Sequence, residues 1–103
     1  MNIHELKKEL TKNNINKKMC LINPVLCPEG ALCLINNDNN SWDVILNDRG
    51  DYLINERFIL EDDACKFFLK NALIELTFRN DFNPKDIQKL LKESKDLLKK
   101  YGY

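Results

Sequence analysis

Four cysteines and a single histidine are the residues of this chain with the most versatile chemistry. Six, five and thirty-one residues separate Cys20, Cys27, Cys33 and Cys65, and His4 is the only histidine. Zinc ligands usually come in closely spaced pairs such as Cys-x-x-Cys, a pattern that this sequence lacks. We therefore interpret the thiols as small apolar side chains, with Cys65 in the core, and favour this over a disulfide or a metal site.

Carboxylate pairs can serve as general acid and base, and the chain has two of them: Asp48 with Asp51, and Asp62 with Asp63. The first pair lies in a predicted turn and the second at a predicted helix start, so backbone geometry explains both. The sequence also lacks the motifs of common nucleophiles, phosphate-binding loops and metalloproteases. We predict a protein that is not an enzyme and has no catalytic residue, cofactor or metal.

Size and composition indicate a single domain over residues 1–103. The chain has 44% apolar and 31% charged residues, with three Gly and three Pro. This composition and length are typical of a globular domain that folds without disulfide bonds or a structural metal ion. Residues 1–14 contain no apolar run of the length of a signal peptide or membrane helix. We expect a cytoplasmic protein with no membrane partner.

Hydrophobic periodicity predicts the order helix, β-meander, helix, helix. Asn2 followed by Glu5 favours a helix start, and helical spacing then extends over residues 2–13. Three later segments have the strand pattern: 31–36, 42–47 and 52–58. They predict an antiparallel meander, and residues 18–23 are a candidate fourth strand, ended by Pro24.

Two further helices are predicted after the meander. Three acids at 61–63 favour a helix start, and helical spacing continues to about residue 78. This helix is apolar on two stripes, so either the last helix, from Pro84 through Tyr101, or a second copy of the chain must cover it. The predicted fold class is α+β, with an N-terminal helix, an antiparallel meander of three to four strands, and two C-terminal helices packed on one face of the sheet.

The tripeptide Arg49-Gly50-Asp51 is one that some extracellular matrix proteins present to integrins. An adhesion ligand must leave the cell, which the N-terminal sequence does not favour. Between two alternating strands, residues 47–50 instead predict a type I turn that closes with a left-handed glycine. We interpret the tripeptide as the tip of a projecting hairpin.

The meander is also acidic: residues 27–63 contain nine acids and two bases, a balance of −7, in a chain of zero net charge. Strand alternation places Asp43, Ile45 and Asn47 on the face away from the helices. With the acidic turns, that face supplies the predicted partner-binding residues: Asp38, Asp43, Ile45, Asp48, Arg49, Asp51 and Glu56. A basic partner would suit them. The alternative is that these acids only discourage edge-to-edge pairing of sheets.

The last helix offers a second candidate surface, rich in lysine. Its members are Lys85, Lys89, Lys92, Lys95, Lys99 and Lys100, interspersed with Glu93 and Asp96. Such a face is usually a solvated surface with ion pairs along the helix. The alternative function is a small regulatory protein that binds nucleic acid through this face, although no aromatic platform or reading motif accompanies it in the sequence.

The run from Ala31 to Leu69 resembles small immunity proteins of bacterial polymorphic toxin systems. The pattern is a Leu-Cys-Leu strand, a Trp-x-Val strand, an Arg-Gly turn, an aromatic residue, and an acidic stretch leading into a helix with Ala-Cys and an aromatic-Leu pair. Its positions here are Leu32, Cys33, Leu34, Trp42, Val44, Arg49, Gly50, Phe58, Glu61, Ala64, Cys65, Phe68 and Leu69.

This resemblance implies a non-catalytic α+β protein that binds a cognate toxin and neutralises it by occlusion. Whether the protein is a monomer or a homodimer depends on what covers the two apolar stripes of the helix at 61–78, the last helix or a second copy. A basic, nuclease-like toxin would suit the acidic meander. The resemblance assigns no contact residue, because immunity proteins vary most where they touch their toxins.

Overall fold

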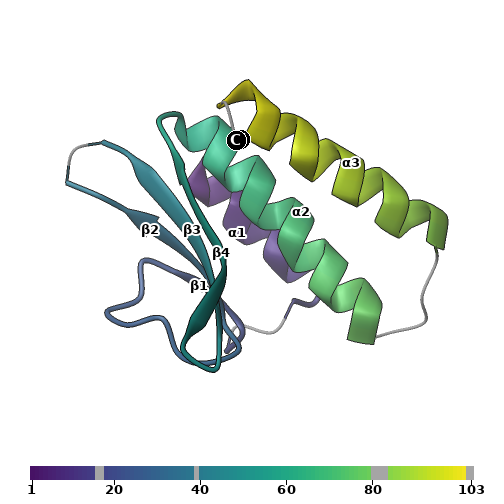
Figure 1. The fold of residues 1–103 in the computed structure, drawn as a ribbon, viewed down its shortest axis with the longest axis horizontal. Coiled ribbons are helices and arrows are strands. Elements are labelled where there is room, and N and C mark those ends of the chain that lie inside the picture. The colour runs from purple at the N-terminus through teal and green to yellow at the C-terminus, as the bar shows by residue number, and fades with distance from the viewer. Residues whose placement is uncertain (16–17, 39, 80–83, 102–103) are drawn as a thin grey trace.

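A mixed β-sheet with helices on one side forms the framework of the protein (Figure 1). The computed structural model describes residues 1–15, 18–38, 40–79 and 84–101. Within them the elements are α1 (Ile3–Lys12), β1 (Cys20–Ile22), β2 (Leu32–Asn36), β3 (Trp42–Asp48), β4 (Asp51–Phe58), α2 (Glu61–Arg79) and α3 (Pro84–Lys100). The strands lie in the order β1-β2-β3-β4. The predicted α+β class is confirmed.

All three helices begin where local chemistry predicted. The side chain of Asn2 caps α1 by accepting a hydrogen bond from the backbone N–H of Glu5 at 2.9 Å. Three acids occupy the first turn of α2, where the positive end of the helix dipole favours them. Proline opens α3, since its missing N–H would have no partner at that position.

The sheet corrects one prediction. Strands β2, β3 and β4 are antiparallel, as expected, but β1 pairs with β2 in parallel, with Cys20 opposite Leu32 and Ile22 opposite Leu34. For two adjacent strands to be parallel, the chain must run back after the first strand to the end of the sheet where that strand began. Residues 23–31 make this return, and we call them the crossover segment. They lie on the side of the sheet away from the helices (Figure 1).

The helix arrangement differs from the prediction in one respect. Helix α2 contacts β2, β3 and β4 as well as α1, whereas α3 packs mainly on α2 and so forms an outer layer. Lys70 of α2 pairs with Glu93 of α3 at 2.7 Å, and the Asn71 amide donates to the Ser94 hydroxyl at 3.3 Å. The last helix therefore covers the second apolar stripe of α2.

Aromatic side chains connect these layers at the end of β4. Phe58 is fully buried, and its ring centroid lies 5.0 Å from that of Phe67 in α2 and 5.0 Å from that of Tyr101 after α3. Leu34 of β2 and Val44 of β3 belong to the same hydrophobic core as Phe58. Among the helices described, none is both long enough and apolar enough to cross a membrane.

Candidate functional site

The β3–β4 hairpin presents the Arg-Gly-Asp tripeptide at its tip. Asp48 pairs with Asp51, so the turn contains only Arg49 and Gly50, with φ angles of 55° and 89°. Positive φ at both central positions is the requirement of a type I′ turn, whose twist matches that of the flanking strands. The predicted type I turn is therefore wrong in type, although the hairpin stands where it was expected. All four residues are exposed.

Asn47 fastens this hairpin to the crossover segment. Its side-chain amide donates to the carbonyl of Cys27 at 2.9 Å, and its Oδ1 accepts from the Gly50 N–H at 3.0 Å. Its backbone accepts from the Gly30 N–H at 2.7 Å and donates to the Ala31 carbonyl at 3.1 Å. Three of these hydrogen bonds join Asn47 to the crossover segment, and the fourth closes the hairpin turn. The Asn47 side chain was expected to face water but is buried beneath the crossover segment.

Asp43 and Ile45 do lie on the face away from the helices. Arg57 donates to both carboxylate oxygens of Asp43, at 2.8 and 3.2 Å, and this contact lowers the pKa of Asp43 below its ordinary value. The charge of Asp43 is thus largely satisfied within the sheet. Ile45 is half-buried and pairs with Cys33 and Asn55. Neither side chain projects freely into solvent.

Asp38 and Glu56 are placed apart from the others. Asp38 is exposed in the β2–β3 turn, at the opposite end of the sheet from Arg49 (Figure 1). Glu56 pairs with Val44 and therefore projects from the side that the helices cover. Burial raises the pKa of the Glu56 carboxyl. Of the predicted interface residues, only Asp48, Arg49 and Asp51 form one exposed group.

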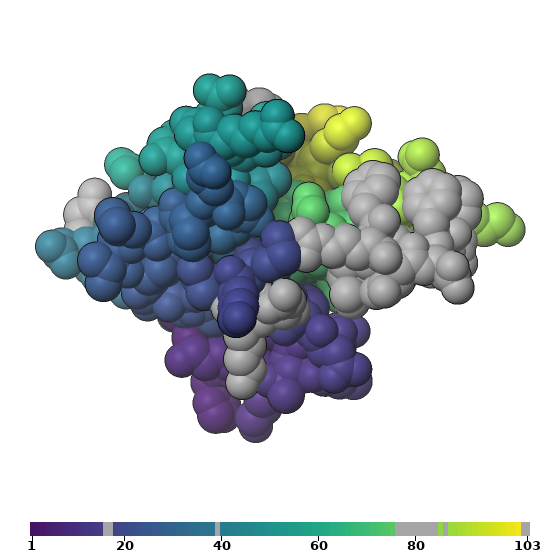
Figure 2. Space-filling view, turned by 90° about the horizontal axis from the view of Figure 1, so that it is seen from below, coloured from purple at the N-terminus to yellow at the C-terminus, as the bar shows by residue number. Residues whose placement is uncertain are grey.

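Apolar residues that the sequence analysis did not select stand beside this group. Val25 is 100% exposed and Leu26 is 80% exposed in the crossover segment, and Tyr52 and Leu53 at the start of β4 are 57% and 66% exposed. Figure 2 shows the crossover segment, in blue, against the hairpin, in teal, on one surface of the protein. One feature of the sequence could have indicated this exposure: the apolar pair lies between two prolines, Pro24 and Pro28, which do not favour a continuous strand.

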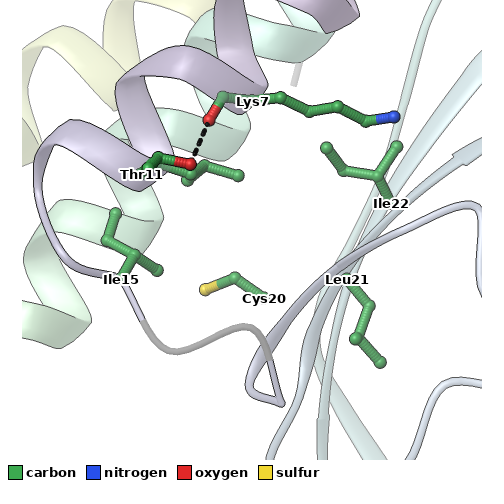
Figure 3. Close-up of a pocket in the computed structure, with 7 residues that line it drawn as sticks. Lys7, Thr11, Ile15, Cys20, Leu21 and Ile22 are labelled. Atoms are coloured by element: carbon green, nitrogen blue, oxygen red, sulfur yellow. Dashed lines mark hydrogen bonds between the residues drawn. The ribbon is translucent and has the colours of Figure 1, made fainter.

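A cavity of about 330 Å³ lies between α1 and β1. Its walls come from Lys7, Leu10, Thr11, Ile15, Cys20, Leu21 and Ile22, several of which point into the space in Figure 3. The Thr11 hydroxyl donates to the backbone carbonyl of Lys7 at 3.0 Å. This lining suits an apolar group and contains neither a carboxylate nor an imidazole, so it offers no acid–base pair.

The cysteines are buried or half-buried, in agreement with their interpretation as apolar side chains. Cys33 and Cys65 are fully buried, and burial raises the pKa of Cys65 to about 11. Burial and a hydrogen bond with the Cys27 thiol also raise the pKa of Cys33. The raised pKa of each thiol favours its neutral form at neutral pH. Among the described residues, His, Cys, Asp and Glu form no cluster of three that could hold a metal ion.

The lysine-rich face of α3 is exposed. Its members all face solvent: Lys85, Lys89, Lys92, Lys95, Lys99 and Lys100. Lys100 also pairs with the buried carboxylate of Asp63 at 2.9 Å. The surface that nucleic acid would contact is therefore available.

Comparison with protein families, curated proteins and solved structures gives no match for this chain.

Proposed function

We propose that the protein is a cytoplasmic immunity protein that neutralises a cognate bacterial toxin by binding and occluding it, without catalysis. The resemblance over residues 31–69 supports the class. One observation of the fold carries the proposal further: Asp48 and Asp51 stand exposed on either side of a two-residue turn whose base Asn47 holds in place. Charges on a fixed, projecting hairpin can meet a partner without first being ordered.

The partner that best suits this hairpin is a basic protein. Electrostatic attraction between an acidic projection and a basic surface raises the rate of encounter and disfavours acidic competitors. A toxin that acts on nucleic acid needs a basic surface for its own substrate. An immunity protein that covers this surface would keep nucleic acid from reaching the toxin, and the toxin's own catalytic residues would stay chemically unchanged.

The first test uses the C-terminal domain of the protein encoded directly upstream of this chain. Co-expression with the immunity protein is expected to restore growth of cells that produce this domain. The double variant Asp48→Lys/Asp51→Lys is expected to associate about tenfold more slowly at low salt, because two attractive charges become repulsive. Stopped-flow binding measures the rate, and a thermal melt verifies that the variant is folded.

A matched control reverses two exposed acids elsewhere, Glu5 on α1 and Asp96 on α3. The variant Glu5→Lys/Asp96→Lys changes the net charge by the same amount and should bind nearly as fast as the wild type. Equal slowing by both variants would mean that net charge matters and the hairpin does not. No rescue and no binding would overturn the immunity function itself.

The alternative, a nucleic-acid-binding regulator, has a specific observation in its favour: the exposed lysines of α3. It predicts that a fluorescent 20-base-pair DNA or RNA binds at low ionic strength and is released steeply as salt is added. The variant Lys89→Gln/Lys92→Gln/Lys95→Gln should reduce this affinity and the salt dependence. Fluorescence anisotropy without binding at about 20 mM salt would exclude this function.

A further inference from the structure

The crossover segment exposes two adjacent apolar side chains that the fold does not use. Val25 and Leu26, which lie between Pro24 and Pro28, are 100% and 80% exposed. Single exposed apolar residues are common on protein surfaces, whereas clusters of them mark interaction sites.

The hairpin carries a second exposed apolar pair, Tyr52 and Leu53. Tyr52 pairs with Asn47, whose side chain binds the carbonyl of Cys27, so Tyr52 lies next to the crossover segment. Leu53 has no partner on β3, because the register passes from Leu46–Ile54 directly to Asn47–Tyr52. The bulge leaves Leu53 exposed beside Tyr52. The two pairs come from segments that lie side by side in Figure 2.

Acids border these two apolar pairs. Asp48 and Asp51 flank the turn, and Glu29 is exposed in the crossover segment, next to Gly30, whose N–H binds the Asn47 carbonyl. Arg49 is the single base among these positions. An apolar centre with a charged rim is the anatomy of protein interfaces, in which central apolar anchors provide most of the affinity and the rim provides orientation.

We propose that Val25, Leu26, Tyr52 and Leu53 form the anchor patch by which the protein enters an apolar recess on a basic protein partner. The proposal rests on the function proposed above and adds to it: the partner's contact surface must contain an apolar recess surrounded by lysine or arginine. The acids of the hairpin then guide the encounter, and the anchor patch determines how long the complex lasts.

The anchoring of the crossover segment makes it suited to this role. Asn47 binds it at Cys27 and Gly30, and the Cys27 thiol lies 3.6 Å from the Ala31 carbonyl while also contacting Cys33. A loop held at several points loses little conformational entropy when it binds. The apolar pair is thus presented in a fixed position.

A second copy of this chain is a poorer occupant. Pairing two anchor patches across a two-fold axis would bring the same acidic rim, with Glu29, Asp48 and Asp51, against itself. Like charges facing each other across an interface oppose association. The same rim attracts a basic protein, which is why the charge selects a heterologous partner.

The test removes the apolar anchors and keeps the charge. Val25→Ser/Leu26→Ser is expected to weaken binding to the C-terminal domain of the protein encoded directly upstream, the probe used above, by at least about tenfold. The loss should appear in the dissociation rate with little change in the association rate, because affinity differences within one interface are mostly in dissociation. Surface plasmon resonance separates the two rates, and the thermal melt should remain close to that of the wild type.

The chain offers a matched control in Ile59 and Leu60. They are also adjacent and exposed, but they follow β4 at the opposite end of that strand from Leu53. Ile59→Ser/Leu60→Ser should leave both rates unchanged.

The outcomes separate the two proposals. If the hairpin charge variants slow association but Val25→Ser/Leu26→Ser leaves dissociation unchanged, the anchor patch is overturned and the immunity function stands. If the wild-type protein binds no toxin domain from the neighbouring gene, the immunity function fails and the anchor patch fails with it. A wild-type dimer in analytical ultracentrifugation that Val25→Ser/Leu26→Ser converts to a monomer would assign the patch to a second copy and overturn the heterologous partner.

Discussion

Replacing Phe58 with alanine is expected to lower the free energy of unfolding by about 3–5 kcal/mol. Phe58 is fully buried, pairs with Trp42 across the sheet, and contacts the rings of Phe67 and Tyr101 at centroid distances of 5.0 Å. Its removal would leave a cavity where β4, α2 and the end of α3 meet. Domains of this size have a total stability of about 5–15 kcal/mol, so the variant would be marginally folded.

Urea denaturation monitored by circular dichroism measures this loss, and Tyr52→Ala supplies a control on the same strand. Tyr52 is more than half exposed, so its truncation should change stability by less than about 0.5 kcal/mol. Phe58→Leu keeps most of the volume and should cost less than Phe58→Ala. A loss below about 1 kcal/mol for Phe58→Ala would show that the three elements do not depend on this ring.

The elements that depend on local chemistry were predictable from the sequence. Periodicity, an Asn2 cap, three acids at 61–63 and Pro84 identified the helices, because capping and amphipathicity are encoded within a few residues. The direction of β1 was not predictable. A three-residue strand has the same local pattern in a parallel or an antiparallel pair, and the choice depends on where the crossover segment carries the chain.

One β-bulge explains why Glu56 was assigned to the wrong face. Counting back from the Asp48–Asp51 pair without a bulge would place Glu56 opposite Asp43, on the outer face. Because β4 contains the extra residue Leu53, Glu56 lies opposite Val44 on the helix side instead. A shift of one residue reverses the face of every later side chain in the strand, and nothing in the local sequence marks the bulge.

The candidate site was predictable only in part, because some of its features depend on contacts between residues far apart in the sequence. The acidic turn at 48–51 follows from the strand pattern, but the burial of Asn47 and the exposure of Val25 and Leu26 follow from the crossover segment. That segment contacts residues about twenty positions away along the chain, such as Asn47 from Cys27. Contacts of that range are not visible in periodicity or turn propensity.

Replacing Asp63 with alanine is the second change with a large expected effect, a loss of about 1.5–3 kcal/mol. The buried carboxylate accepts hydrogen bonds from the Tyr101 hydroxyl at 2.7 Å and from Lys100 at 2.9 Å, and so ties the start of α2 to the end of α3. Lys100 is half exposed and can return to water, which limits the cost. The Tyr101 hydroxyl would lose its acceptor.

The effect of Asp63 should depend on pH in a defined direction. Burial raises the pKa of this carboxyl, but the hydrogen bonds from Tyr101 and Lys100 outweigh it, so the folded-state pKa lies below the ordinary value of 3.8. A depressed pKa stabilises the fold above the unfolded-state pKa and ceases to do so as pH falls through the folded-state pKa. The stability difference between wild type and Asp63→Ala should be constant from pH 5 to 7 and shrink below about pH 4.

A double-mutant cycle with Tyr101→Phe isolates the contact itself. Phenylalanine retains the ring that packs edge-on against Phe58 and removes only the hydroxyl that donates to Asp63. The double variant should then lose less stability than the sum of the single variants, with a coupling of about 1 kcal/mol at pH 6. Strict additivity would mean that the hydroxyl–carboxylate bond adds no stability. The end of α3 would in that case depend on the Phe58–Tyr101 ring contact, and Asp63→Ala would weaken the fold only through Lys100 and the first turn of α2.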